Sequence, residues 1–291
     1  MIKSLSDKMF STRPAGTLYH YTSLAGLEGI LSSGSLWATD IRYLNDAAEM
    51  QHTAEIIRVE IAKRLELGYG NQKLLSQLKE WIFDRLENGH MLFVSSFTAN
   101  GNILSQWRGY CQHGKGVSLG FDADLICACA SEQSFQIGKC IYDYATQAEL
   151  ASQIISAIED LAERIGEAGK SKRHPSQSYH DVFEAVEADI LRIASLIKHP
   201  SFKEEDEWRV VSPVLTNYVT SPITYREGLS MLVPYIEFKL ARKSKVELEH
   251  VILGPTPNVN LSMSSLSRYL SRKGFSPSHG VMYCSIPYRH G

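Results

Sequence analysis

The sequence predicts a mixed α and β protein in which a β-rich core carries helical insertions. Two runs, 91–97 and 232–238, are apolar and β-prone, as buried strands are. By contrast, apolar residues recur at helical spacing through most of 145–198. A chain of 291 residues can bury a full core without disulfides or metals. We therefore expect a single α+β domain over residues 1–291.

The expected elements of the first half are strands that alternate with helices, since β-prone runs are separated by amphipathic stretches and turn residues. Asp46 is a candidate N-cap for the first helix of an insertion at about 47–87, because its carboxylate can accept free backbone amides. In order, we expect a loosely attached arm at 1–16, strand 18–22, a helix stopped by Gly34, strand 36–39, helices to about 64 and over 71–87, strand 91–97, helix 104–110 and strand 116–121.

The second half begins with a helical hairpin and then returns to strands. Its two helical repeats are separated by a polar stretch at 169–176, so we interpret 145–198 as an insertion into the β-rich domain. In order, the remaining elements are strands at 207–211, 232–238 and 251–254, a helix at 260–273 and a strand at 281–286.

Composition indicates a protein without an obvious charge-driven partner. The formal net charge is -2 and the isoelectric point about 6.6, so no basic field points to nucleic acid. The N-terminus has no apolar stretch of signal-peptide length, and no run of about 18 apolar residues is present. We expect a cytoplasmic protein with no membrane partner.

The five cysteines do not predict a disulfide framework, because their number is odd and no export signal is evident. The alternative is a zinc site formed by Cys127, Cys129 and Cys140 with Cys111 and His113. They lack a pair of Cys-x-x-Cys knuckles at useful spacing, so we expect buried thiols and no metal.

Two polar motifs stand where strands begin or end. His20, Tyr21 and Thr22 follow Leu18 and Tyr19 in the first expected strand, which can present a histidine to a ligand. A structural histidine is the alternative to a ligand-binding one. The second motif is an acidic run, 204–207, that leads directly into strand 207–211. Such a run can be a solvated turn, or a set of carboxylates with a chemical task.

Together these motifs resemble the ADP-ribosyltransferase superfamily. The His-Tyr-Thr segment is similar to the first NAD-binding motif of that superfamily, and Glu205-Asp206-Glu207 is similar to its Glu-x-Glu. The resemblance implies a split antiparallel β-sheet core with helical insertions and NAD as co-substrate. It implies that His20 and Thr22 hold the dinucleotide. Many relatives have glycine where this chain has Tyr21, which would contact the nicotinamide through its backbone or ring.

For the acids, the resemblance implies that Glu207 stabilises the positive charge that develops on the ribose as nicotinamide leaves. Glu205 would orient or deprotonate the acceptor. Glu204 and Asp206 stay open as alternatives, because a shift of one residue in a strand exchanges its faces.

Further candidates for the NAD site are aromatic and basic. The aromatic residues Tyr43, Trp107 and Tyr110 are candidates for stacking on nicotinamide, with core packing as the alternative. The arginines would bind pyrophosphate, with pairing to the acidic run as the alternative. They are Arg209, Arg226 and Arg289.

Over about 18–289 the chain also resembles a bacterial family named for domain of unknown function 2971. The matching segments include 106–110, 116–121, 205–209 and 233–236, in that order. This resemblance implies remote similarity to the ADP-ribosyltransferases and a role as a toxin or defence effector. It leaves open an antitoxin or other regulatory partner.

We therefore expect an enzyme that cleaves the nicotinamide–ribose bond of NAD and transfers ADP-ribose to a protein or nucleic-acid acceptor. With water as acceptor it would be an NAD glycohydrolase. A nucleotide sensor without turnover and a partner-binding scaffold are the other classes. The sequence contains neither a Gly-rich phosphate loop nor a Gly-x-Gly-x-x-Gly turn, and this argues against a kinase, an NTPase or a Rossmann dehydrogenase.

Overall fold

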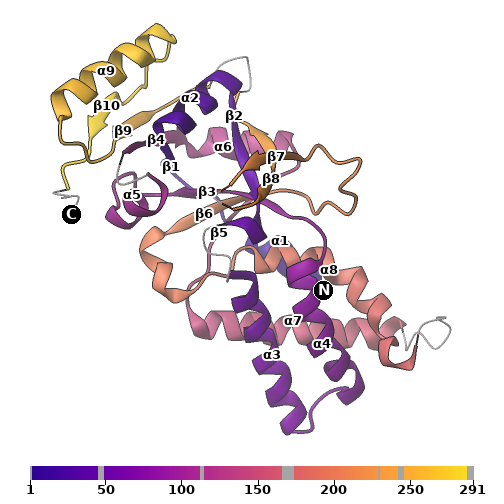
Figure 1. The fold of residues 1–291 in the computed structure, drawn as a ribbon. Coiled ribbons are helices and arrows are strands. Elements are labelled where there is room, and N and C mark those ends of the chain that lie inside the picture. The colour runs from indigo at the N-terminus through magenta and orange to yellow at the C-terminus, as the bar shows by residue number, and fades with distance from the viewer. Residues whose placement is uncertain are drawn as a thin grey trace.

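The computed structural model describes residues 2–44, 49–111, 115–165, 174–228, 230–241 and 246–286. Within these residues the chain forms a large mixed β-sheet with helices around it (Figure 1). The predicted α+β class is confirmed. The expected N-cap Asp46 and the candidate Arg289 lie outside the described residues. In the described part of the chain, no helix is long and apolar enough to cross a membrane.

The elements include the expected strands and helices, together with α6, β5 and β7, which were not expected. The α-helices are α1 (Ile2–Met9), α2 (Leu24–Ser33), α3 (Glu49–Glu66), α4 (Gln72–Asn88), α5 (Leu104–Tyr110), α6 (Ala123–Glu132), α7 (Tyr144–Ile165), α8 (His180–Ala194) and α9 (Val259–Arg272). Short 3-10 helices are η1 (Ile41–Tyr43), η3 (Pro175–Gln177) and η4 (Pro200–Glu205). The strands are β1 (Thr17–Ser23), β2 (Ser35–Asp40), β3 (Phe93–Thr98), β4 (Gly116–Asp122), β5 (Gln136–Lys139), β6 (Glu207–Val211), β7 (Thr224–Glu227), β8 (Leu232–Lys239), β9 (His250–Leu253) and β10 (Val281–Tyr283).

The sheet divides into two branches at β3. Its strand order is β10-β9-β4-β1-β3-β2-β8-β7, with β6 and then β5 on the other edge of β3. Thr98 of β3 lies between Tyr19 of β1 and β6, whereas Val94 lies between Thr39 of β2 and β6. Strands β1 and β2 therefore share one edge of β3 and diverge between these two points. All strand pairs named here are antiparallel except β9–β10, which is parallel and makes the sheet mixed.

Local sequence explains how β1 turns into β2. The Ser23 side chain accepts a hydrogen bond from Gly26 N and caps α2. Gly34 ends the same helix with φ of 72°, a left-handed conformation that glycine adopts without steric cost. A ten-residue helix thus returns the chain to the sheet and places β2 on the second branch.

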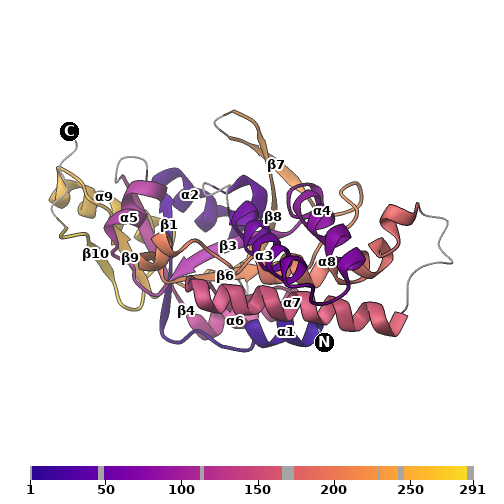
Figure 2. The same cartoon turned by 90° about the horizontal axis from the view of Figure 1, so that it is seen from below.

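The two helical insertions pack together into one layer. Helices α3, α4, α7 and α8 lie below the sheet in Figure 1, and Figure 2 shows α7 running across beneath it. Their apolar faces form one core cluster with Ile2, while a second cluster lies between the sheet and α2, α6 and α9. Residues 2–9 differ from the loose arm expected, since they form α1, and its Ile2 is buried against this helical layer.

Candidate functional site

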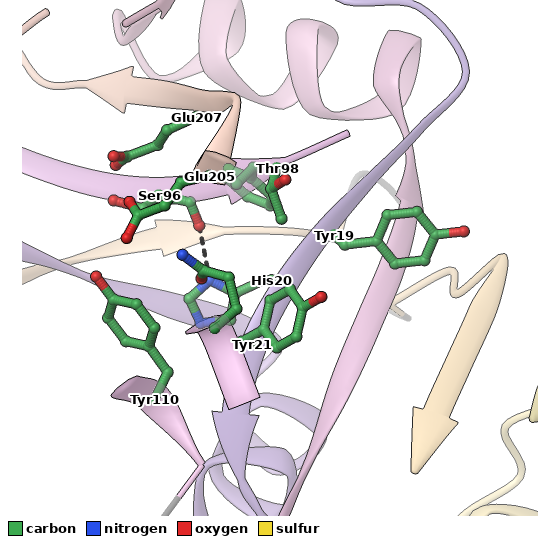
Figure 3. A pocket seen from close by; sticks show the side chains of 10 residues that line it. Tyr19, His20, Tyr21, Ser96, Thr98, Tyr110, Glu205 and Glu207 are labelled. Carbon is green, nitrogen blue, oxygen red and sulfur yellow. Dashed lines mark hydrogen bonds between the residues drawn. The ribbon is translucent and has the colours of Figure 1, made fainter. Parts of the chain in front are cut away.

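One small pocket collects the predicted polar residues from distant parts of the chain. It lies where β1, β3, α5 and the start of β6 meet, and Figure 3 shows His20, Tyr110 and Glu205 gathered around it, whereas the Tyr19 ring points away. The lining residues are Tyr19, His20, Tyr21, Ser96, Phe97, Thr98, Gln106, Tyr110, Glu205 and Glu207. Among the sequence candidates, the structure thus brings His20, Tyr21, Tyr110, Glu205 and Glu207 together.

His20 sits in the fork of the sheet. Its Nδ1 lies 2.9 Å from the carbonyl oxygen of Ser96 in β3 (Figure 3). Because a carbonyl can only accept, Nδ1 carries the proton and Nε2 of the neutral ring is an acceptor. Burial lowers the pKa of His20, and the hydrogen bond to Ser96 opposes that shift only in part. His20 therefore offers a hydrogen-bond acceptor, not a cation, at neutral pH.

This protonation state can be tested by ¹⁵N NMR of labelled histidine. We expect Nδ1 of His20 to be protonated and Nε2 unprotonated at pH 7, with a titration midpoint below 6.5. The pKa of His20 is lower in the folded than in the unfolded chain. His20 therefore contributes to stability at a pH above its unfolded pKa, and this contribution is lost as the pH falls through the folded pKa. Protonation at Nε2 at pH 7, or a midpoint at or above 6.5, would contradict this assignment.

The acidic run folds so that two of its carboxylates face inward. Glu205 ends η4, and Asp206 follows with φ of 43°, a left-handed conformation, before Glu207 begins β6. Glu205 and Glu207 are buried as a result. Glu204 is exposed, and Asp206 pairs with Lys139 near the surface. The sequence left open which of the four acids face the site. The structure separates them into two inner acids, Glu205 and Glu207, and two outer acids, Glu204 and Asp206.

The left-handed conformation at Asp206 predicts a specific stability difference. A β-branched residue is strained at positive φ, whereas glycine is not. Both Asp206→Val and Asp206→Gly lose the salt bridge to Lys139, so we expect the valine variant to be less stable than the glycine variant by about 1–2 kcal/mol. Urea unfolding of the two variants measures this difference, and equal stability would show that the conformation imposes no such strain.

A buried cluster of five charged groups forms the back of the pocket. Lys198 Nζ lies 2.5 Å from Glu205 Oε2, 2.6 Å from Glu207 Oε2 and 3.5 Å from Glu49 Oε1. Arg209 donates from Nε to Glu207 at 2.8 Å and from Nη2 to Glu49 at 2.8 Å. Two cations thus face three carboxylates, which is a formal charge of -1 beside the pocket.

These cations fix the state of Glu207. Burial by itself would raise the pKa of this carboxyl, but the charges of Arg209 and Lys198 outweigh burial and lower the pKa well below its ordinary value. Glu207 is therefore a carboxylate throughout the physiological pH range. Two further hydrogen bonds hold the cluster in place: Glu207 N donates to the Tyr142 hydroxyl at 2.9 Å, and Arg209 Nη1 donates to Ser195 O at 2.8 Å.

The opposite wall of the pocket is aromatic. The Tyr21 ring meets Trp107 edge-on, with centroids 4.7 Å apart. The Tyr21 hydroxyl accepts from Ile103 N and donates to Asn100 O. Trp107 is fully buried and donates from Nε1 to Asn102, which places it behind Tyr21 as a packing residue. Of the aromatic candidates on α5, Tyr110 is the one that reaches the pocket.

The other candidates lie apart from this pocket. Arg209 is 1% exposed and forms ion pairs with Glu49 and Glu207. It therefore pairs with the acidic run, which was the alternative to binding pyrophosphate. Thr22 and Tyr43 do not line the pocket, and Tyr43 is partly exposed in η1. Arg226 lies on β7, on the other branch of the sheet.

The pocket is too small for a whole dinucleotide. The space available to the centres of water molecules is about 40 Å³, which is room for a few waters in a pocket that is partly open to solvent. A dinucleotide could insert only one ring or sugar here, and the remainder would have to lie on the surface around the mouth. The acceptors that converge on this space are two carboxylates and a neutral histidine, which favour a ligand that presents hydroxyl groups or positive charge.

The cysteines belong to packing regions of the molecule. Cys111 and Cys284 are buried in the cluster around Tyr21, and burial raises the pKa of the Cys111 thiol to about 12. In the described part of the chain, no group of three or more His, Cys, Asp or Glu side chains is placed to hold a metal ion.

Sequence reasoning missed Lys198 and Glu49. Lys198 had a recognisable signal, since it follows the apolar residues Leu196 and Ile197 where an ordinary surface lysine is not expected. Glu49 had none, because its role depends on a contact with Arg209 across 160 positions of sequence.

Comparison with known proteins identifies a family for part of the chain. Residues 106–210 match the family model described as protein of unknown function (DUF2971), which confirms the recognition of this family over that segment. The segment contains four pocket residues, Gln106, Tyr110, Glu205 and Glu207. Searches of curated proteins and of solved structures found no match.

Proposed function

We propose that this protein is an NAD-dependent ADP-ribosyltransferase-like enzyme that releases nicotinamide and passes ADP-ribose to a macromolecular acceptor. The observation that carries the proposal is the single pocket in which His20 of β1 meets Glu205 and Glu207 at the start of β6. Sequence resemblance assigns His20 to NAD binding, Glu207 to the developing charge on the ribose and Glu205 to the acceptor. Their convergence from segments almost 190 positions apart supports that assignment.

The fork of the sheet also supports the proposal. A split antiparallel β-sheet core is the arrangement that the resemblance to ADP-ribosyltransferases implies. Here β1 and β2 diverge along one edge of β3, and His20 bonds Ser96 in the gap between them. A role as a bacterial toxin or defence effector is part of the proposal and rests on the family resemblance alone.

The geometry suits cleavage of a glycosidic bond at a positively charged leaving group. The bond between ribose C1′ and the pyridinium nitrogen breaks, and nicotinamide leaves as a neutral molecule with the bonding electron pair. Glu207, held ionised by its cations, would stabilise the charge that develops on the ribose. The acceptor then bonds to C1′ and gives its proton to Glu205, whose side chain is 11% exposed against 5% for Glu207.

Incubation with NAD labelled in its adenylate part, in a bacterial lysate, tests the proposal. We expect release of nicotinamide together with label on a macromolecule, and treatment with protease or nuclease identifies that acceptor. Release of nicotinamide with free ADP-ribose would instead make water the acceptor and the protein an NAD glycohydrolase. Absence of release, with no NAD binding by calorimetry, would contradict the proposal and favour a partner-binding scaffold.

A further inference from the structure

An aromatic pair lies on the second branch of the sheet. Trp37 of β2 and Tyr235 of β8 have ring centroids 4.6 Å apart at an interplanar angle of 32°. Tyr235 is buried, whereas 47% of Trp37 is exposed. A large exposed aromatic ring that is held rigid by a second ring is the type of surface on which nucleic-acid bases stack.

A guanidinium without an acidic partner lies beside this pair. Arg226 of β7 is 5.5 Å from the centre of the Trp37 ring and donates from Nη2 to the Thr39 hydroxyl at 3.1 Å. Its Nε is buried without a hydrogen-bond acceptor, and none of the described carboxylates forms an ion pair with it. Arg226 therefore carries a positive charge that none of these carboxylates offsets, beside the exposed edge of Trp37.

Strand register places these residues on the pocket's side of the sheet. Thr39 pairs with Val94 of β3, and Ser96, which lines the pocket, is two residues farther along the same face. Diagonal neighbours of this kind have Cα atoms about 7–8 Å apart. Glu237 is the acid opposite Trp37 in the strand register. Arg226 is opposite Val233, which lies four residues before Glu237 on β8, so Glu237 is not the cross-strand partner of Arg226.

We propose that Trp37, Tyr235 and Arg226 form a subsite for a nucleoside phosphate, with the base on the exposed part of Trp37 and the phosphate on Arg226. A planar guanidinium matches phosphate oxygens in pairs, and the aromatic ring binds any base through its face. The subsite goes beyond the proposed transfer reaction, because nucleotide binding here needs neither His20 nor Glu207. The subsite lies apart from the small pocket but on the face of the sheet that carries Ser96, so it suits a part of a ligand that the pocket cannot enclose.

Tryptophan fluorescence provides a direct test. The chain has four tryptophans, and Trp81, Trp107 and Trp208 are at most 7% exposed. Quenching by a bound base therefore reports mainly on Trp37. We expect AMP to quench saturably, adenosine to bind at least about tenfold more weakly, and inorganic phosphate to leave the fluorescence unchanged.

Variants separate the subsite from a nonspecific effect. Arg226→Gln is expected to weaken AMP binding at least about tenfold, and Trp37→Ala to weaken it by calorimetry, whereas Arg268→Gln, on exposed helix α9, leaves it unchanged. Glu207→Gln should bind AMP like the wild type, so failure of the transfer reaction would not affect this result. Absence of saturable AMP binding, or equal affinity in Arg226→Gln, would overturn the proposal.

Two ligands identify the source of the nucleotide. If the subsite holds the ADP half of the co-substrate, Arg226→Gln weakens binding of NAD and a short single-stranded oligonucleotide does not bind. If it holds an acceptor strand, Arg226→Gln weakens binding of the oligonucleotide and leaves that of NAD unchanged. Loss of neither interaction in the variant would overturn the proposal as well.

Discussion

Glu207→Gln is expected to lower nicotinamide release from NAD by about 100- to 1000-fold while the protein stays folded. The loss has this size because the substitution removes a fixed charge that stabilises the transition state. The fold survives because the buried cluster then contains two cations and two carboxylates, which is a formal balance of charge. Turnover of labelled NAD measures the first effect, and a urea unfolding curve measures the second.

The same acidic run supplies the control. Glu204 is exposed, and its carboxylate contacts Ser105 instead of the buried cations. Glu204→Gln should therefore retain activity within about twofold of the wild type, since surface substitutions of this kind have small effects. Equal activity in Glu207→Gln and the wild type would exclude Glu207 as the transition-state carboxylate.

Lys198→Met is expected to destabilise the protein by about 3–5 kcal/mol at pH 7.5. Removing one partner of a buried ion pair leaves charges without compensation, and this costs more than the pair contributes. Here the ammonium that contacts Glu205, Glu207 and Glu49 disappears, and one cation is left against three acids. Urea unfolding at pH 7.5 and pH 5 measures the effect.

The sign of the pH dependence follows from the carboxylates. In the wild type the lowered pKa of Glu207 contributes stability above its ordinary value of 4.5, and this stability is lost as the pH falls through the folded pKa. Without Lys198, Arg209 alone opposes the effect of burial on Glu207, so the pKa of this carboxyl is higher than in the wild type and its protonation at low pH relieves the uncompensated charge. The penalty should therefore be smaller at pH 5 than at pH 7.5.

Lys139→Met is the matched control for this variant. Lys139 pairs with Asp206 of the same acidic run at 2.8 Å, but both side chains are almost half exposed. Its loss should cost less than about 1 kcal/mol at either pH, because solvent screens exposed ion pairs. A similar cost for Lys198→Met, or a cost independent of pH, would show that the inner cluster does not depend on Lys198 for charge compensation.

The elements that sequence predicted correctly have strong local patterns. Strand β6 begins and ends at Glu207 and Val211 as expected, and β4 and β8 extend one residue beyond their predicted ends. Strand β5 was missed, since a four-residue edge strand with a glycine gives no usable periodicity. The arm at 1–16 was misjudged because the spacing of Ile2, Leu5 and Met9, which is that of an amphipathic helix, was overlooked.

For the site, sequence located the chemistry but not its support. His20, Glu205 and Glu207 were identifiable because histidine and acids at strand ends resemble a known pattern. Whether Arg209 binds a ligand or pairs with protein acids depends on Glu49, and no local pattern indicates a contact between helix α3 and strand β6. Likewise, the separation of inner from outer acids depends on one backbone conformation, at Asp206.

The bond between Arg209 and Glu49 also bears on how the protein reaches its native state. It closes a segment of 160 residues that includes both helical insertions. Contacts so distant in sequence require a large loss of chain entropy and form slowly. During synthesis, the charged cluster cannot assemble until β6 has left the ribosome and the helices have docked. Incomplete chains that end before η4 and β6 thus carry His20 and the fork strands β1, β2 and β3 but neither acid of the pocket.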